Sequence, residues 1–453
     1  MSYAAFAART FSDIRENVFH STPLEYINNY LASRGAVEYE HVMGVYISSA
    51  GAHILNLLNK ACSSARRCNF AGHENCSRRH IQSLHPFFMM RSGQLPELRA
   101  HVMTIAPTSF SKDYFMNFFG SPDFGFFAKG AFPMFNMGTM TEAAFIGGKV
   151  PTRNGAIGTY GVAREHCEAI VMAPEYYAIS AEGKVDRSKN FETVLLRALY
   201  GGDVDKNLVG VEWHYKTFVT IWGATQPGVR FSLASGIGRR FNFIVIHAND
   251  KLESELKNSV LDGVGKSVDW NVIENVRGFF YKLATMNNIP KIVHSSEYEA
   301  FRRQLDTILH TDIYMADNIA YGYNLVQYYN DGEALVVHLD DTLRKMIKRL
   351  INDRFLATQE GLLNNELVLY PIIEKHQVMT KYALAKRAAY KQRVSFEEAM
   401  RTIDQAMKDG TLGFFQRLRK HGGYDTIVYN PSLEESQAKS MWENILEKRG
   451  ENR

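Results

Sequence analysis

The sequence is poor in cysteine and has no long apolar run, and these absences exclude several classes of protein. Only four cysteines occur among 453 residues, a usage expected in a reducing compartment rather than in a disulfide-stapled secreted domain. No stretch approaches about eighteen consecutive apolar residues, so we expect no membrane partner and no spanning helix. No basic-then-apolar leader opens the chain, and we therefore expect a cytoplasmic protein.

The charge is small overall but unevenly distributed. The chain is 45% hydrophobic, enough for a large core and roughly two to four domains. Its formal net charge is only +4, yet residues 379–421 hold ten Lys or Arg against four Asp or Glu, a local +6. The remainder is therefore about −2, and the basic character belongs mainly to one segment.

A strand followed by a lysine-bearing loop and a helix is the central motif of the chain. Val102 to Ala106 is a mostly apolar run, and an apolar-rich segment from Tyr114 to Phe119 comes after the loop. Loop N–H groups and the positive end of a helix dipole attract a phosphate, and Lys112 at the helix start adds a full charge. The residues expected to bind the cofactor are Ala106, Pro107, Thr108, Ser109, Phe110, Ser111, Lys112 and Asp113.

This loop departs from the pattern G-x-x-x-x-G-K-[ST]. Ala106 and Ser111 replace the two glycines, and Asp113 stands where a hydroxyl would meet Mg²⁺. An ordinary strand-to-helix turn with an exposed lysine is the alternative. The loop alone is therefore a weak signal, and its interpretation depends on the later strands of the chain.

Two further predicted strands end in candidate catalytic residues. The strand Ala169 to Ala173 precedes Glu175, a carboxylate placed to activate water or, alternatively, an exposed residue at a helix start. The strand Phe218 to Gly223 precedes Thr225 and Gln226, which occupy the position where an ATPase senses the γ-phosphate or orients water.

Two arginines and two hairpins complete the pattern. Arg239 and Arg240 precede the strand Phe243 to Ile246, either as surface charge or as a residue that reaches a neighbour's nucleotide. Turn signals predict an inserted hairpin around residues 147–155, and Val204 to Tyr215 alternates like a second hairpin, with its turn at residues 205–207 around Lys206.

In this order the segments resemble the AAA+ ATPase core of MCM-type replicative helicases and related P-loop proteins of archaeal plasmids and viruses, over roughly residues 95 to 250. The resemblance implies ATP with Mg²⁺, a homo-oligomeric ring with a hexamer as a candidate, and a DNA-contacting hairpin near Lys206. It also implies that an arginine, Arg239 or Arg240, completes the nucleotide site of a neighbouring subunit. Pro174 stands where this family has an aspartate. A DNA-binding regulator or assembly factor with a switch-like or inactive nucleotide site is the alternative.

The basic segment near the C-terminus resembles a winged helix, with three helices and a basic hairpin. Such a domain places its third helix in the major groove and its wing against phosphate, while a protein-interaction domain of the same shape is the alternative. The residues expected to contact DNA, besides Lys206, are Lys381, Lys386, Arg387, Arg401, Arg417, Arg419 and Lys420.

The predicted fold is α/β, an AAA+-like P-loop core with a helical lid, a helical N-terminal region and a C-terminal winged-helix domain. The expected boundaries are 1–95 for the N-terminal region, 96–250 for the core, 251–360 for the lid, 361–435 for the winged helix and 436–453 for a tail. Within the lid we expect helices at Val272 to Leu283, Glu297 to Leu309 and Leu335 to Asn352.

A cysteine and histidine cluster lies in the N-terminal region. Cys62, Cys68, His73 and Cys76 could supply a Cys₃His zinc site. Their spacing does not repeat a paired C-x₂-C pattern, so a basic surface segment with incidental thiols is the alternative and no metal is assigned.

Overall fold

The computed structural model divides the chain into two compact units. One comprises residues 1–246 and 254–358, and the other comprises residues 247–253 and 359–453. The first unit therefore takes in the predicted N-terminal region, all but the last few residues of the predicted core, and all of the predicted lid except its two ends. The structure describes residues 6, 8–33, 40–59, 98–106, 116, 118–121, 125–126, 134–137, 142–152, 155–174, 195, 198–199, 203–208, 211–226, 238–246, 254–258, 261, 268–286, 290–305, 312–358, 369, 372–392, 396–408, 412–418 and 423–448.

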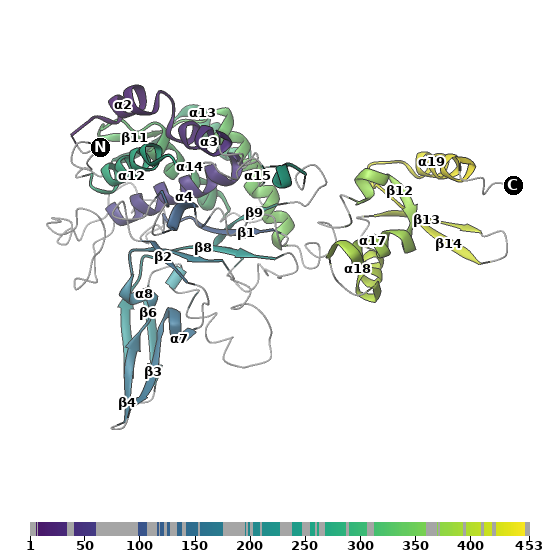
Figure 1. Cartoon of the computed structure of the whole chain (residues 1–453), viewed down its shortest axis with the longest axis horizontal. Helices are drawn as coiled ribbons and strands as arrows, with labels where there is room; N and C mark the ends of the chain where they lie inside the picture. Colours follow the sequence, from purple (N-terminus) through teal and green to yellow (C-terminus); the bar gives the residue numbers. More distant parts are fainter. Residues whose placement is uncertain are drawn as a thin grey trace. The chain divides into compact units, whose positions relative to one another are not determined.

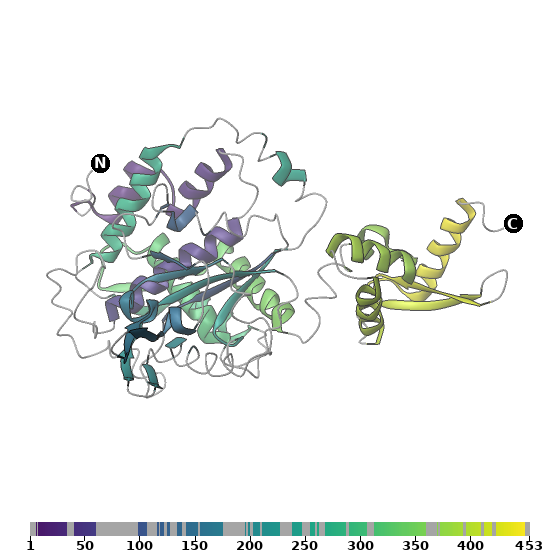
Figure 2. The same ribbon diagram turned by 60° about the horizontal axis from the view of Figure 1, so that its bottom comes forward.

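A five-stranded parallel sheet lies at the centre of the first unit, with strand order β2-β5-β8-β1-β9. The strands are β1 (His101–Ile105), β2 (Met134–Asn136), β5 (Ile170–Ala173), β8 (Thr220–Thr225) and β9 (Phe241–Val245). All but β2 are buried along their whole length, as parallel strands covered on both faces are. The predicted α/β class is confirmed, and Figure 2 shows the strands side by side.

Helices gather on one side of this sheet (Figure 1). Helix α4 packs against β1 and against α14, and α15 packs against β9. The helices on this side include α2 (Phe11–Ile14), the π-helical turn η1 (Arg15–Phe19), α3 (Pro23–Ser33), α4 (Glu40–Asn59), α12 (Trp270–Ala284), α13 (Ser296–Arg303), α14 (Asp312–Gln327) and α15 (Asp341–Thr358). Two short helices, α7 (Glu142–Phe145) and α8 (Val162–Glu165), lie on the other side of the sheet, where α7 contacts β3 (Gly147–Thr152) and α8 contacts β4 (Gly155–Tyr160) (Figure 1).

Two of the three helices expected in the lid were partly wrong. The helix expected at Glu297 to Leu309 ends at Arg303, where Gln304 caps it. Residues predicted as the start of the helix Leu335 to Asn352 form strand β11 (Ala334–Val337), which pairs in parallel with β10 (Lys291–His294). Leu335 and Val337 are buried while their neighbours are exposed, the two-residue period of a strand. The helix begins only at Asp341, after Asp340 accepts a hydrogen bond from Leu343 N at 2.7 Å.

Helices α4 and α14 cross in direct backbone contact. A Cβ atom added to Gly322 of α14 would lie 1.8 Å from the carbonyl oxygen of Ser48, and one added to Gly51 of α4 would lie 2.3 Å from that of Gly322. Only hydrogen atoms fit between the two backbones at this point. The crossing therefore requires glycine on both helices, and α14 lies against α4 with no side chain as a spacer.

We predict that Gly322→Ala lowers the free energy of unfolding by about 3 kcal/mol, because the new methyl group must push two packed helices apart. Urea unfolding monitored by circular dichroism measures the change. Gly332→Ala is the matched control, since a Cβ there meets nothing closer than 3.8 Å. Equal stability of the two variants would contradict the close crossing.

The two predicted hairpins are confirmed and project from the sheet on the side away from the helices (Figure 1). One consists of β3 (Gly147–Thr152) and β4 (Gly155–Tyr160), and the other of β6 (Asp203–Leu208) and β7 (Val211–Lys216). The predicted turn of the second was wrong. Lys206 lies within β6, opposite Trp213, and the strands meet at Leu208 and Val211.

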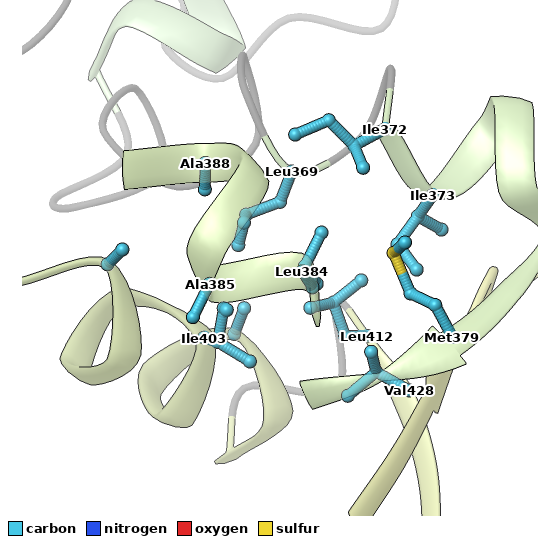
Figure 3. Packing of buried hydrophobic residues seen from close by; sticks show 12 residues of the cluster. Leu369, Ile372, Ile373, Met379, Leu384, Ala385, Ala388, Ile403, Leu412 and Val428 are labelled. Atoms are coloured by element: carbon cyan, nitrogen blue, oxygen red, sulfur yellow. The ribbon is translucent and has the colours of Figure 1, made fainter. Parts of the chain in front are cut away.

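The second unit is built on a three-stranded antiparallel sheet of order β12-β14-β13. Its elements are β12 (Val378–Thr380), α17 (Lys381–Gln392), α18 (Phe396–Lys408), β13 (Gly413–Leu418), β14 (Tyr424–Tyr429) and α19 (Glu435–Lys448). Figure 3 shows side chains of both helices, such as Leu384 and Ile403, converging with Met379 and Val428 on one face of the sheet.

Two of the three predicted helices, α17 and α18, and both predicted strands of this unit are present, and residues 372–376, within the first predicted helix, are helical. The hydroxyl of Thr380 accepts a hydrogen bond from Ala383 N at 3.1 Å, as expected for the cap of α17. The segment from 436 onward was wrongly expected to be a tail. It forms most of α19, whose Ala438, Trp442 and Leu446 are buried against the other face of the sheet.

Candidate functional site

Strands β1 and β8 form a switch point in the connectivity of the central sheet. The chain leaves β1 for β2 at one end of the sheet, returns through β5 to β8, and then passes β1 to reach β9 at the other end. The connections that leave the neighbours β1 and β8 therefore run in opposite directions. In open parallel sheets the crevice outside the carboxyl ends of such a pair is the usual ligand site.

The structure brings predicted residues from two separate segments together at this edge. Ile105 of β1 pairs with Thr225 of β8, and Ala106 N donates a hydrogen bond to Thr225 O at 3.1 Å. Ala106 is the first residue of the predicted phosphate loop. Gln226, the next residue after Thr225, is exposed, so its amide faces solvent where the loop begins.

Thr225 carries a buried hydroxyl with no partner. Its side chain is 0% exposed, and within the described part of the chain Oγ1 finds no hydrogen-bond partner. Buried polar atoms are almost always paired, so an exception calls for an explanation such as a bound ligand or water. This hydroxyl lies at the carboxyl end of β8, beside the start of the loop.

The third strand of this edge is β5. Ala173 pairs with Gly223 of β8, so the chain beyond β5 leaves the sheet at the same edge as the chains beyond β1 and β8. Glu175 follows two residues later but lies outside the described residues, as do residues 107–115 with Lys112 and Asp113. The residues on either side of the loop are described. Phe119, just beyond it, packs with ring centroids 5.4 Å from Trp222.

Arg239 and Arg240 lie at the opposite edge of the sheet. They directly precede β9, whose first residue Phe241 pairs with His101, the first residue of β1. A five-residue strand separates its two ends by about 15 Å. Arg239 is exposed and Arg240 half-buried. The structure therefore does not bring these arginines to the loop of their own chain.

A buried arginine on α15 holds the turn that bears these two residues. Arg354 Nη1 donates to the carbonyl oxygens of Gly238 at 2.9 Å and Phe241 at 3.0 Å. Its Nε lies 2.9 Å from Asp312 Oδ1 at the start of α14, with both side chains no more than 3% exposed. A cavity of about 20 Å³, large enough for one water, adjoins the pair.

A second arginine joins the two hairpins. The guanidinium carbon of Arg164, on α8, lies 3.6 Å from the ring centroid of Tyr160 on β4 and 5.9 Å from that of Tyr215 on β7. Tyr215 also donates its hydroxyl hydrogen to Ile146 O at 2.8 Å. Burial raises the pKa of Tyr215, so the phenol keeps that proton. These contacts join the β3–β4 hairpin to the β6–β7 hairpin, whose strand β6 contains Lys206.

The residues predicted to bind DNA in the second unit are distributed over three elements. On α17, Lys381 Nζ forms a 2.5 Å ion pair with Asp404 of α18, while Lys386 and Arg387 are exposed. On α18, Arg401 is exposed, and Arg417 on β13 is half-buried. Arg419 and Lys420 lie outside the described residues.

Sequence reasoning missed Arg354 and Arg164. Each acts on a partner far away in the sequence, Gly238 for Arg354 and Tyr215 for Arg164. Neither belongs to a local motif. The sequence around Arg354 gives little signal, because the polar residues Asn352 and Asp353 precede it and only Phe355 and Leu356, which follow it, are apolar.

The comparisons with known proteins leave the family open. No family model matches the chain, and no curated protein sequence matches it. In the described residues, no group of three His, Cys, Asp or Glu side chains is arranged to hold a metal ion; the cluster at Cys62, Cys68, His73 and Cys76 lies outside them. Among the described helices, none has the length and apolar character to span a bilayer.

Asp353, next to Arg354, makes stability depend on pH. Its carboxylate oxygen accepts Val245 N at 3.0 Å, and burial raises its pKa from 3.8 to about 7. Two groups face it: Arg349 at 3.8 Å and His41 at 3.9 Å. Burial lowers the pKa of His41 to about 3, so the imidazole is neutral in the folded chain over the same range.

We predict that Asp353→Asn gains stability relative to the wild type as pH rises. Between about pH 4 and 7 the folded wild type keeps a proton on Asp353 that the unfolded chain loses, so its stability falls through that window. The amide removes this loss and still accepts Val245 N. Urea unfolding at pH 5 and pH 8 should show a relative gain of about 1 to 3 kcal/mol. The lowered pKa of His41 makes its own contribution to stability rise with pH, opposite to that of Asp353. Urea unfolding of His41→Gln at the same two pH values measures this contribution. A difference that does not change with pH would contradict the raised pKa.

Proposed function

We propose that this chain is an ATP-dependent, DNA-acting ATPase of the AAA+ type that works in a homo-oligomeric ring, as a replicative helicase or replication initiator of a plasmid or virus. The observation that carries the proposal is the buried Thr225 hydroxyl at the β1–β8 switch point, beside Ala106, for which the described residues supply no hydrogen-bond partner. A γ-phosphate oxygen in the crevice would give this hydroxyl its missing acceptor.

The strand order supports the same proposal. The predicted loop follows β1, the predicted water-activating Glu175 follows β5, and Thr225 and Gln226 end β8; these three strands are adjacent in the sheet. In the proposed reaction Lys112 would stabilise the charge on the transferred phosphoryl group and Glu175 would orient the attacking water; Mg²⁺, when bound with ATP, would supply neutralising charge for the phosphates. The second unit would hold duplex DNA as a winged helix, with its basic hairpin on phosphate.

A second candidate is a regulator or assembly factor that binds nucleotide as a switch without turnover. Asp113 and Pro174 favour it, because one takes the place of a Mg²⁺-binding hydroxyl and the other that of a metal-binding carboxylate.

We predict that Lys112→Ala abolishes ATP binding, while Glu175→Gln keeps ATP bound and stops turnover. The first removes the full positive charge of the loop, and the second keeps the side-chain shape without a carboxylate. Equilibrium binding of a fluorescent ATP analogue and phosphate release measure the two effects. Lys345→Ala, at an exposed position on α15, is the control.

Unchanged affinity in Lys112→Ala would remove the phosphate-loop assignment. A wild type that binds ATP but releases no phosphate, with or without DNA, would favour the switch.

We predict that the arginines act between subunits. Mixing Arg239→Ala/Arg240→Ala protein with Lys112→Ala protein should restore part of the ATPase activity, because some interfaces then pair an intact loop with intact arginines. Loss of such an arginine lowers the rate by about 10³ to 10⁵, so the rescue stands well above background. Absence of rescue at every mixing ratio, with both variants assembled, would rule out a shared site.

A further inference from the structure

Helix α17 presents aromatic rings and cations together on its exposed side. Tyr382 is 64% exposed and Tyr390 is 87% exposed, and Lys386 and Arg387 between them are exposed as well. Residues 382, 386 and 390 are spaced by four, so they follow one face of the helix. The opposite face, with Leu384, Ala385 and Ala388, is buried in the core of the unit (Figure 3).

The positive charge of the basic segment is concentrated on this helix. Helix α17 contains four Lys or Arg and no carboxylate, whereas α18 contains three carboxylates against two cations. One of those carboxylates, Asp404, is paired with Lys381 at the start of α17. A polyanion that approaches the unit therefore meets more favourable charge on α17 than on α18.

The aromatic rings distinguish between kinds of polyanion. Phosphates of a closed duplex are held by cations and hydrogen-bond donors, among which a tyrosine hydroxyl can count, but the face of an aromatic ring adds nothing to such contacts. Unpaired bases, in contrast, stack on aromatic side chains, and cations beside the rings hold the phosphates between them. The ring of Tyr382 lies 5.1 Å from that of Phe396, itself 38% exposed, so the stacking surface extends onto the first residue of α18.

We propose that the α17 face, formed by Tyr382, Lys386, Arg387, Tyr390 and Phe396, binds a single strand of nucleic acid. Bases stack on Tyr382 and Tyr390, and Lys386 and Arg387 contact the phosphates. The inference rests on the proposed function in so far as the chain acts on DNA. It adds a site for unpaired strand, separate from α18 and the basic hairpin, and it assigns Lys386 and Arg387, already expected to contact DNA, to the phosphates of that strand.

The test measures the affinity of the full chain for labelled oligothymidylate of about twenty nucleotides and for a duplex of the same length. Tyr382→Ala/Tyr390→Ala should weaken binding to the single strand about 100-fold, or about tenfold for each ring, and change duplex binding less than twofold. Tyr382→Phe/Tyr390→Phe should bind like the wild type, because the rings remain. Tyr314→Ala is the control: Tyr314 is also an exposed tyrosine, at 43%, but it lies on α14 of the first unit, outside every DNA contact named above.

The charge contribution is measured separately. Lys386→Gln/Arg387→Gln should flatten the slope of log affinity against log salt for the single strand by about 1.4, or about 0.7 for each lost phosphate contact. Arg387 Nη1 also contacts His376 Nε2, so circular dichroism must show that this variant is folded.

Three results would overturn the inference. Equal losses on duplex and single strand would mean that the face does not select unpaired bases. If Tyr382→Ala/Tyr390→Ala binds the single strand like the wild type but no longer self-associates in light scattering, the α17 face is a contact between two copies of the chain and not a binding site for nucleic acid. A wild type that binds neither DNA would refute both this inference and the DNA-binding part of the proposed function, while the nucleotide site is judged independently by Lys112→Ala.

Discussion

Buried hydrogen bonds between helix α4 and the central sheet fix the arrangement of the first unit. Tyr46 bonds to Thr104 of β1 at 2.8 Å, and Ser49 accepts the indole N–H of Trp222 on β8 at 2.8 Å. One turn further, His53 Nδ1 lies 2.8 Å from Thr220 Oγ1. A shift of α4 by one residue would leave several of these groups buried and unpaired, each at a cost of about 1 to 3 kcal/mol. The helix therefore has a single position on the two strands of the switch point.

The remaining helices of this layer depend on α4 in turn. Since α14 crosses it at Gly51 and Gly322 in backbone contact, the position of α14 follows from that of α4. The buried pair between Arg354 and Asp312 then ties α15 to the start of α14. A removed partner would leave a buried charge uncompensated, which is strongly destabilising. Residues before the sheet and after it in sequence are thus parts of one packed layer, so the N-terminal segment without a recognisable motif is structurally central.

The local parts of the fold could be predicted because each is encoded in a short pattern. Strands β1, β5 and β8 are buried on both faces and appear as mostly apolar runs, and Thr380 and the helix it caps are adjacent in sequence. Strand β11 was missed because its four apolar residues end only three residues before helix α15, and the exposure of Val336 between buried neighbours is what shows the strand. The role of α4 could not be predicted, since hydrogen bonds from Ser49 and His53 reach residues more than a hundred positions away.

The candidate site was predictable in its residue types but not in its geometry. Polar residues after apolar runs suggested which strand ends matter, yet the sequence does not say which strands are neighbours; that depends on pairing between residues such as Ile105 and Thr225. The charge count shows that residues 379–421 are basic. The proposed preference of a polyanion for α17 over α18 depends instead on which side chains are exposed and on the ion pair between Lys381 and Asp404.

The position of the two arginines has a consequence for any ring that this chain forms. Arg239 and Arg240 precede β9 at the amino edge of the sheet, while Ala106 and Thr225 lie at its carboxyl edge, about 15 Å away. A nucleotide site that uses both sets of residues must therefore be assembled from two copies. Arg354 holds the arginine-bearing turn to α14 and α15, and α14 is in backbone contact with α4, which is hydrogen-bonded to β1. Because the two edges of one subunit belong to the same packed body, a rearrangement at such a shared site would move whole subunits relative to each other rather than the turn alone.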